Sequence, residues 1–594
     1  MSPPSSLPAT PLFPDRAAAQ RFDGALHAAA APLWAGLSPI TLALAGVDWG
    51  LHLATQPAQA GRLALAAQQL ALQWWVDCAS RQDLCDPAGA HAADLRFSHP
   101  AWHHWPYAPW ARAYLASEAW WREATALRGM QPHHQEVTKV FARQWLDAFS
   151  PANAGLANPE VLQRTLASGG RNLQQGLAHA LDDWRRRQGL APLQPPEQPF
   201  QPGVDVAITP GEVVHRNALV ELIQYAPDPA TTTVQAEPVF IVPSWIMKYY
   251  ILDLSPHNSM VRWLVSQGHT VFILSWRNPD ADDALLGMDD YLELGVFDSL
   301  AAIARRVPGE AVHCAGYCLG GTLLAIAAAA LARPQQVQGA DALPAIASLS
   351  LLAAETDFSE PGEMGVLIDE SQVTLLEEMM AERGYLTGPQ MAGSFAFLHS
   401  RELIWSATLR EIWLGERLRP NDLMAWNADV TRMPAAMHSQ YLRRCYLRNE
   451  LAESRYPVEG APVSLADIRW PIFLVGTEKD HVSPWKSVYK LHRLASAAPI
   501  TFVLCSGGHN AGIVSEPGHA GRSYALRSQP ADAAWVPPEA WREGAEPHEG
   551  SWWPAWHDWL LARGSGRQVA PRAVAAADSL GAAPGGHVQQ RWHD

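Results

Sequence analysis

The first part of the chain has the spacing of hydrophobic positions that is typical of amphipathic helices. From Arg16 to Arg187, apolar residues recur every three or four positions, with few interruptions by Gly or Pro within each run. The clearest such runs are Arg62 to Val76, Glu118 to Leu127 and Val137 to Phe149. This pattern predicts a mainly helical domain.

A proline-rich stretch, Ala191 to Gly203 (APLQPPEQPFQPG), ends that pattern. Repeated prolines interrupt helices and favour extended backbone, so we place a domain boundary here, with the helical domain over residues 16–200. Residues 1–15 are rich in Pro and Ser, and we expect this leader to be disordered because it offers little apolar surface to bury.

After the boundary, short apolar runs alternate with helical patterns. Helical patterns occupy His257 to Gln267, Tyr291 to Arg306 and Thr322 to Leu331. The runs that read as buried strands are Val239 to Val242, Thr270 to Ser275, Val312 to Ala315, Ile346 to Ala353, Ile472 to Gly476 and Ile500 to Cys505. Alternation of this kind predicts an α/β domain over residues 201–562, with a mostly parallel sheet and helices on both faces.

The strand signal disappears between Glu355 and about Arg455, where helical stretches such as Val373 to Arg383 and Phe395 to Leu414 take over. We expect this insertion to form a helical cap, at about residues 355–455, over the strand ends where open α/β sheets bind ligands. One more apolar helix, Trp552 to Leu561, precedes a Gly/Ala/Pro-rich tail over residues 563–594.

Composition narrows the possible partners and the compartment. Of 594 residues, 59 are acidic and 44 basic, so a formal net charge of -15 argues against nucleic acid as a partner. The six cysteines show neither metal-ligand spacing nor a disulfide framework, and no signal-peptide pattern opens the chain, which favours a cytoplasmic setting. The apolar run Leu37 to Val47 is too short to cross a bilayer, so we expect no transmembrane segment.

The motif Gly316-Tyr317-Cys318-Leu319-Gly320-Gly321 carries the main chemical signal. It places a thiol between glycines where a predicted strand ends and a predicted helix begins, which is the pattern of a nucleophile elbow. A helix N-terminus favours the thiolate form of a cysteine. The alternative is a structural cysteine on a tight turn.

A nucleophile on an elbow needs a base and an acid, and both follow later predicted strands. Asp480 comes just after Ile472 to Gly476, and His509 just after Ile500 to Cys505. The order nucleophile, acid, histidine is that of α/β-hydrolases, and all three residues are expected at the same edge of the sheet. Taken singly, Asp480 could cap a helix and His509 could be structural. His481 is the rival base.

Acyl transfer also needs donors for an oxyanion. The backbone N–H of Leu319 is the first candidate, and the loop after Val239 to Val242 offers the second, with Ile246 preferred and Trp245 close behind; an ordinary strand-to-helix connection is the alternative. Six aromatic residues in the helical domain are expected to form its core, although they could instead form a surface for a partner or a hydrophobic product: Trp102, Trp105, Tyr107, Trp110, Trp120 and Trp121.

Longer motifs over roughly residues 90–562 resemble class I polyhydroxyalkanoate synthases, which act without a second type of subunit. They are GGRNL (169–173), PSWIMKYYILDL (243–254), QGHTVFILSWRNPD (267–280), the elbow itself and AWNADVTRMP (425–434). Three features depart from the family pattern: Asn421 in the cap, the Gly-Gly-His-Asn context of His509, and the tail after Leu580.

The resemblance implies an α/β-hydrolase fold with Cys318 as nucleophile, Asp480 as acid and His509 as base. It implies an (R)-3-hydroxyacyl-CoA donor, with 3-hydroxybutyryl-CoA expected, a growing polyester as product, and no metal or redox cofactor. We expect a homodimer in the cytoplasm at the surface of polymer granules. The residues expected at the substrate pocket are Trp245, Tyr317, His481 and Trp426.

Two other functions remain open at this point. The first is a Cys-dependent thioesterase or ester hydrolase of the same fold, because water competes with a hydroxyl for an acyl-cysteine. The second is a non-catalytic protein that coats hydrophobic granules through its N-terminal aromatic residues.

Overall fold

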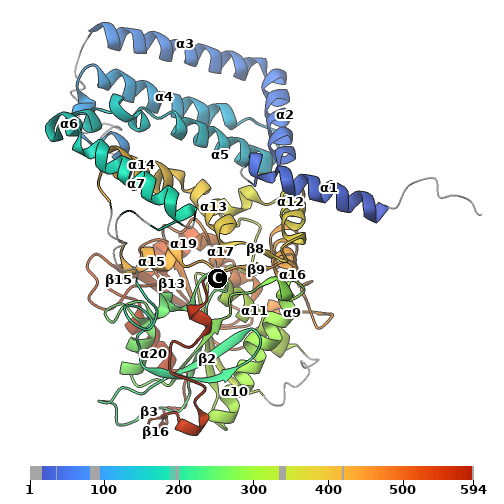
Figure 1. Cartoon of the computed structure of the whole chain (residues 1–594). Helices are drawn as coiled ribbons and strands as arrows, with labels where there is room; N and C mark the ends of the chain where they lie inside the picture. Colours follow the sequence, from blue (N-terminus) through green and yellow to red (C-terminus); the bar gives the residue numbers. More distant parts are fainter. Residues whose placement is uncertain are drawn as a thin grey trace, which may run out of the picture.

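The computed structural model describes residues 16–34, 36–80, 94–188, 190–191, 193, 200–333, 343–417 and 420–591. The predicted leader, residues 1–15, lies outside the described residues, as do residues 194–199 of the proline-rich boundary. Figure 1 shows two parts, a stack of helices from the first part of the chain and a body that contains the main sheet.

The N-terminal part consists mainly of helices, as predicted. Their bounds are α1 Arg16–Ala30, α2 Pro39–Thr55, α3 Pro57–Ser80, α4 Tyr107–Thr125, α5 Pro132–Ala148, α6 Pro159–Ser168 and α7 Arg171–Arg187. None of the described helices is by itself long and apolar enough to span a bilayer; Arg16–Trp34 and Pro39–Thr55, bent by 66°, satisfy that test only as a pair.

Aromatic side chains hold these helices together. The Trp120 indole N–H donates to the Leu63 carbonyl at 2.9 Å, which ties α4 to α3, and the rings of Trp49 and Trp121 lie 6.2 Å apart between α2 and α4. Trp102 is buried, whereas Trp105 and Trp110 remain about half exposed. Of the six residues predicted to form the core, Trp102 is buried and Tyr107, Trp120 and Trp121 are partly buried, so the prediction holds only in part.

In the body, ten strands of the described chain form one sheet in the order β1-β2-β5-β4-β6-β7-β12-β13-β14-β15. The six central strands run parallel, and the two strands at each edge pair antiparallel. Their bounds are β1 Gly211–Arg216, β2 Val220–Tyr225, β4 Val239–Val242, β5 Val271–Trp276, β6 Val312–Tyr317, β7 Ile346–Leu352, β12 Ile472–Thr477, β13 Ile500–Cys505, β14 Ser523–Gln529 and β15 Glu546–Glu549.

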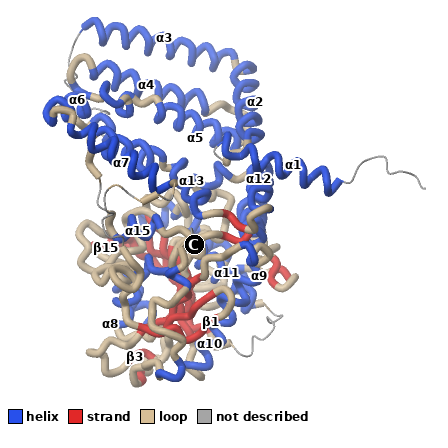
Figure 2. Tube along the Cα trace, in the orientation of Figure 1, coloured by secondary structure: helices blue, strands red, loops and turns tan. Residues whose placement is uncertain are grey.

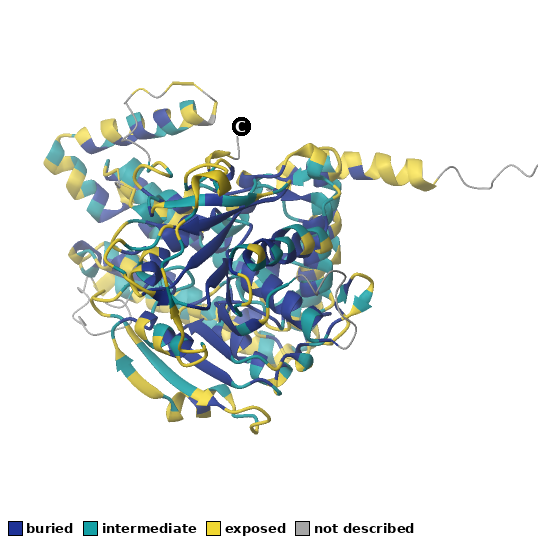
Figure 3. Ribbon diagram, turned by 90° about the horizontal axis from the view of Figure 1, so that it is seen from below, coloured by how far each residue is buried: buried dark blue, intermediate teal, exposed yellow. Residues whose placement is uncertain are grey.

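Apolar side chains cover both faces of the central strands. Along β4, Phe240 and Val242 join one core with helices α10 (Asp298–Arg306) and α11 (Leu319–Ala332). Val239 and Ile241 join the opposite core with α8 (Met260–Ser266) and α20 (Trp553–Leu561). Each fully buried side chain of this size stabilises the fold by about 1.5–3 kcal/mol. Figure 3 shows the strands at the centre of the body as buried. The predicted fold class is confirmed.

Between β7 and β12 the chain forms the mainly helical insertion seen above the sheet in Figures 1 and 2. Its helices are η10 Glu363–Leu367, α12 Glu370–Ala381, α13 Gly388–Leu398, η11 Arg401–Trp405, α14 Ser406–Thr408, η12 Leu409–Trp413, α15 Asp422–Ala428, α16 Ala435–Tyr441 and η13 Leu442–Leu447. A short antiparallel pair, β8 (Tyr385–Leu386) with β9 (Met433–Pro434), was not predicted. Asn421, the departure noted in this region, caps α15 by accepting a hydrogen bond from the Met424 N–H.

The helical part docks on this insertion through α7. A Cβ built at Gly176 would lie 1.7 Å from the Ile412 carbonyl oxygen of η12, so only glycine permits the approach. The buried Asn172, from the GGRNL motif, donates to the Trp413 carbonyl at 2.8 Å. Arg401 of η11 also binds the Asp147 carboxylate of α5 at 2.6 Å.

The C-terminal tail follows the sheet edge rather than leaving the body. After α20, β16 (Gln568–Val569) pairs with β3 (Val234–Gln235), and the Val213 N–H of β1 donates to the Gly581 carbonyl at 2.8 Å. Near the end of the described chain, Lys248 Nζ donates to the Gln590 carbonyl at 2.6 Å. The tail is therefore tied to the segment that follows β4.

Candidate active site

Cys318 lies at the sharp junction between β6 and α11. Its backbone has φ 53° and ψ −126°, a strained conformation for a residue with a side chain. The glycines around it allow the turn: a Cβ at Gly320 would lie 2.2 Å from the Val242 carbonyl oxygen, and one at Gly316 would lie 2.5 Å from Gly321 Cα. The local geometry is therefore that of an elbow that presents its thiol at the carboxyl edge of the sheet.

The elbow is also fixed to the neighbouring strand. The Cys318 N–H donates to the Leu352 carbonyl, at the end of β7, at 2.9 Å. The Cys318 side chain is partly exposed and sits at the N-terminus of α11.

Asp480 and His509 lie on the loops that follow β12 and β13. These strands are parallel neighbours in the sheet, so the two loops meet at one edge. His509 Nδ1 lies 2.8 Å from Asp480 Oδ2, and the Asp480 carboxylate is fully buried. It also accepts hydrogen bonds from the Ser483 N–H at 2.8 Å and from Thr477 Oγ1 at 2.9 Å.

Electrostatics favour the charged form of both partners. Burial alone would raise the pKa of Asp480, but the charge of His509 and the hydrogen bonds to the carboxylate lower it below its usual value. Burial likewise opposes the charge on His509. The charges of Asp480 and then Cys318, together with their hydrogen bonds to the imidazole, nevertheless raise the His509 pKa well above its usual value. The imidazole therefore interacts with both the carboxylate and the thiol.

The rival base, His481, is placed differently. Its side chain is exposed, and its ring lies 6.0 Å from that of His399 in the insertion. The Asp480 carboxylate is hydrogen-bonded to His509 and not to His481.

The two predicted oxyanion donors belong to segments that touch each other. Leu319 is the first residue of α11, and the loop after β4 lies against the elbow, because a Cβ at Gly320 would come within 2.4 Å of the Pro243 carbonyl oxygen. The Ile246 N–H has a long contact with Ser244 Oγ at 3.4 Å, while the Ile246 carbonyl accepts from Thr431 Oγ1 of the insertion at 2.6 Å. The insertion thus holds this loop in place.

The predicted pocket residues fall into three environments. Trp245 is buried, with its ring 5.9 Å from that of Tyr441 in the insertion. Tyr317 lies beneath the His509 loop and donates from its hydroxyl to Asn510 at 2.6 Å. Trp426 is buried and donates from its indole N–H to the Lys248 carbonyl at 2.7 Å. Tyr317 and Trp426 therefore support the loops around the site.

One charged residue beside the site was missed from the sequence. Glu355 is 4% exposed, and burial, followed by the charges of Asp480 and Cys318, raises its pKa well above the usual value. Glu355 follows β7, so the rule that pointed to Asp480 and His509 as residues just beyond strand ends could have identified it.

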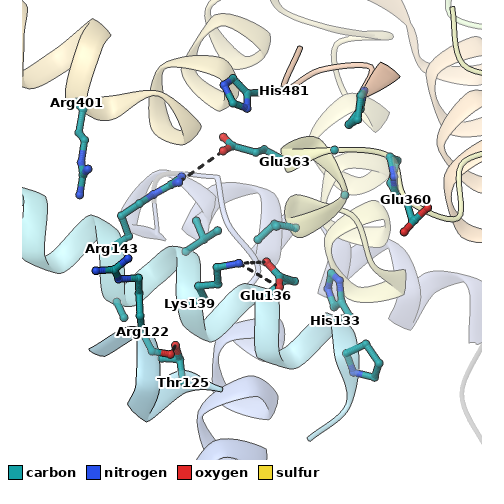
Figure 4. Close-up of a pocket in the computed structure, with 18 of the residues that line it drawn as sticks. Arg122, Thr125, His133, Glu136, Lys139, Arg143, Glu360, Glu363, Arg401 and His481 are labelled. Carbon is teal, nitrogen blue, oxygen red and sulfur yellow. Dashed lines mark hydrogen bonds and ion pairs between the residues drawn. The ribbon is translucent and has the colours of Figure 1, made fainter. Parts of the chain in front are cut away.

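A cavity of about 1630 Å³ separates α4 and α5 from the body and reaches Asp480 and Tyr446. Figure 4 shows Arg122, Lys139 and Arg143 on one side of it, with Glu363 and His481 on the other; Arg143 pairs with Glu363 at 3.5 Å. Of the four predicted pocket residues, only His481 lines this cavity.

Comparison with known proteins identifies the family. Residues 93–264 match the family described as poly-beta-hydroxybutyrate polymerase N-terminus, residues 17–59 match a second N-terminal family of the same polymerase, and residues 237–515 match the α/β-hydrolase fold family.

Curated relatives cover most of the chain. A poly(3-hydroxyalkanoate) polymerase of Methylorubrum extorquens is 38% identical over 84% of this chain and 81% of its own length. The corresponding polymerase subunit of Rhizobium meliloti is 36% identical over 85% and 81%, and that of Cupriavidus necator is 36% identical over 84% and 83%. The chain belongs to the poly(3-hydroxyalkanoate) polymerases, the polyhydroxyalkanoate synthase family.

Proposed function

We propose that this protein polymerises (R)-3-hydroxyacyl-CoA, with 3-hydroxybutyryl-CoA as the main donor, into polyhydroxyalkanoate through an acyl-Cys318 intermediate. The observation that carries the proposal is the elbow thiol of Cys318 beside an imidazole that is hydrogen-bonded at 2.8 Å to a buried carboxylate. Membership of the polymerase family supports polymerisation over other acyl-transfer reactions.

In the first step, the Cys318 sulfur, whose proton is held by His509, attacks the thioester carbonyl of the donor. A new C–S bond forms, and the bond to coenzyme A breaks as the CoA sulfur leaves with the proton held by His509. Because one thioester replaces another, the acyl group stays activated. Asp480 orients the imidazole and stabilises its charged form.

In the second step, the hydroxyl of another unit or of the growing chain attacks the acyl-Cys318 carbonyl. His509 accepts the hydroxyl proton, an ester bond forms, and the Cys318 sulfur is released while the proton stays on His509. Each cycle lengthens the polyester by one unit. The N–H groups of Leu319 and Ile246 are our candidates to stabilise the oxyanion in both steps.

Exclusion of water favours transfer over hydrolysis. The aromatic side chains of Trp245, Tyr441, Tyr446 and Phe358 form a continuous cluster between the loop after β4 and the segment after β7, with ring separations of 4.9–5.9 Å along it. Such walls keep an acyl-cysteine in an apolar environment. The cavity in Figure 4, which reaches Tyr446, is our candidate route to this site.

We further propose that α2 contacts the polymer granule in the cytoplasm. Ile40, Leu44, Val47 and Leu51 recur at helical spacing and are each more than half exposed. Leu44→Glu combined with Leu51→Glu should reduce co-sedimentation with granules several-fold, whereas Gln68→Glu on α3 should leave it unchanged. Unchanged attachment of the double variant would reject this face. The working form is proposed to be a homodimer, which sedimentation equilibrium can test.

Incubation with 3-hydroxybutyryl-CoA tests the main proposal. We expect free CoA and a high-mass polyester with little free 3-hydroxybutyrate. If the main product is free 3-hydroxybutyrate, the protein is a thioesterase instead. If no CoA is released, the non-catalytic, granule-coating function is favoured.

A further inference from the structure

Glu355 is a buried acid that the reaction steps above do not use. It lies three residues beyond the end of β7, is 4% exposed, and has a carboxylate oxygen, Oε1, with no hydrogen-bond partner among the described residues. A buried polar oxygen without a hydrogen-bond partner lowers the stability of the fold, so the presence of a glutamate here calls for an explanation.

The backbone around Glu355 is fixed to the elbow. Thr322 Oγ1, in the first turn of α11, donates to the Glu355 carbonyl at 2.7 Å. The preceding residue, Ala354, packs so closely that its Cβ would lie 2.5 Å from a Cβ built at Gly321. Glu355 therefore has little freedom to move away from the candidate nucleophile.

The surroundings of this carboxyl are otherwise aromatic. Phe358, three residues on, has its ring 4.9 Å from that of Tyr446, and Tyr446 lies 5.5 Å from Tyr441. Burial and then the charge of Glu355 raise the pKa of Tyr446, which places the carboxyl beside this aromatic cluster. An apolar pocket with one or two placed polar groups is the usual design of a small-ligand site.

Of the two cationic groups that act on Glu355, His509 is hydrogen-bonded to Asp480, and Lys490 forms no ion pair with Glu355. Lys490 Nζ instead binds the Glu360 carboxylate at 2.6 Å and Ser359 Oγ at 2.9 Å. Burial and the neighbouring Asp480 and Cys318 raise the pKa of Glu355. The unpartnered Oε1 of Glu355 can accept a hydrogen bond.

We propose that Glu355 is a specificity-determining residue that hydrogen-bonds the 3-hydroxyl of the acyl group carried on Cys318. The inference rests on the proposed function and deepens it. An acyl chain on the Cys318 sulfur would extend along the aromatic cluster, where its only hydroxyl needs a polar partner. The unpartnered oxygen of Glu355 supplies that partner, and an acyl group without the hydroxyl would leave the carboxyl unsatisfied.

The test compares two thioesters in single-turnover acylation of the full-length protein, 3-hydroxybutyryl-CoA and butyryl-CoA, which lacks only the hydroxyl. Wild type should be acylated at least about 10-fold faster by the hydroxylated donor. Glu355→Leu should lose about 10-fold in kcat/KM for 3-hydroxybutyryl-CoA and stay within about 2-fold for butyryl-CoA. Glu355→Gln, which keeps a hydrogen-bonding oxygen, should retain most of the preference.

Each outcome decides the inference. Equal losses of Glu355→Leu on both thioesters, or no loss on either, would overturn the role of Glu355 alone. If Glu355→Leu fails to fold, wild type and Glu355→Gln still test the role of Glu355. Equal acylation of wild type by the two thioesters overturns that role. A preference of at least 10-fold that Glu355→Gln retains supports it. A wild type that neither thioester acylates at Cys318 would overturn the proposed function and this inference with it.

Discussion

His509 Nδ1 donates a hydrogen bond to the Asp480 carboxylate at 2.8 Å, although the two residues are 29 positions apart on separate loops. The contact follows from topology, because β12 and β13 are parallel neighbours and their following loops leave the sheet at the same edge. Since Nδ1 is engaged, Nε2 is the nitrogen left to face the thiol.

Removal of the thiol should abolish turnover without unfolding the protein. Cys318→Ala should reduce CoA release from 3-hydroxybutyryl-CoA by at least about 10³-fold, because no nucleophile remains. Cys318→Ser should also be severely impaired, since a neutral hydroxyl is a weaker nucleophile than a thiolate. Thiol titration of the released CoA measures the effect, with Cys78→Ala on α3 as the control. Turnover in Cys318→Ala close to wild type would remove the proposed nucleophile.

The elbow should not tolerate a methyl group at Gly320. A Cβ there would lie 2.2 Å from the Val242 carbonyl oxygen, so Gly320→Ala should destabilise the body by about 3 kcal/mol. Gly393→Ala in α13, where nothing lies within 4 Å, is the matched control and should be neutral or stabilising by up to about 1 kcal/mol. Urea unfolding of the two variants checks this. Equal stabilities would show that the glycines do not set the turn.

The Asp480–His509 pair should give stability a definite dependence on pH. The pKa of His509 is raised above its unfolded value of about 6.5, so its contribution is fully present below that pH and is lost as pH rises through the folded pKa. The pKa of Asp480 is lowered, so its contribution is lost as pH falls through the folded pKa. Urea unfolding of wild type and His509→Gln should therefore show a stability difference that shrinks as pH rises above about 6.5. A stability difference between wild type and His509→Gln that grows with pH would contradict this prediction.

Loss of the Asp480 charge should slow elongation more than acylation. CoA is a good leaving group, whereas attack by an alcohol requires a strong base, which the carboxylate helps to provide. In single turnover with 3-hydroxybutyryl-CoA, Asp480→Asn should accumulate Cys318 carrying one or a few units, and His509→Ala should fail at both steps. Asp228→Asn, in the turn after β2, should behave as wild type. Equal failure of Asp480→Asn at both steps would refute this division of roles.

The sequence predicts the central strands well and the sheet edges poorly. The bounds of β4 and β13 are as predicted, because strands buried on both faces are continuous apolar runs. The strand β2 was missed because it contains a buried charge, Glu221, which pairs with Arg216 at 2.6 Å. The half-exposed strand β14, next to the edge strand β15, has no apolar run to mark it.

The same limits apply near the site. Asp480 and His509 could be located because each follows a strand within a Gly- or Pro-containing loop. Glu355 follows a strand as well, but its raised pKa depends on burial and on the charges of residues that are distant in sequence, such as Asp480. The docking of the tail depends on backbone groups, such as the Gly581 carbonyl that accepts from Val213, and these leave no mark in the pattern of side chains.

The most direct test of the central claim is the intact mass of the protein after brief mixing with 3-hydroxybutyryl-CoA, followed by peptide mapping. The account predicts that wild type carries one or more 3-hydroxybutyryl units on Cys318 through a bond that hydroxylamine cleaves, and that Cys318→Ala carries none. Units attached to another residue, or a wild type that forms polyester with an unmodified Cys318 at every time point, would contradict the covalent mechanism proposed here.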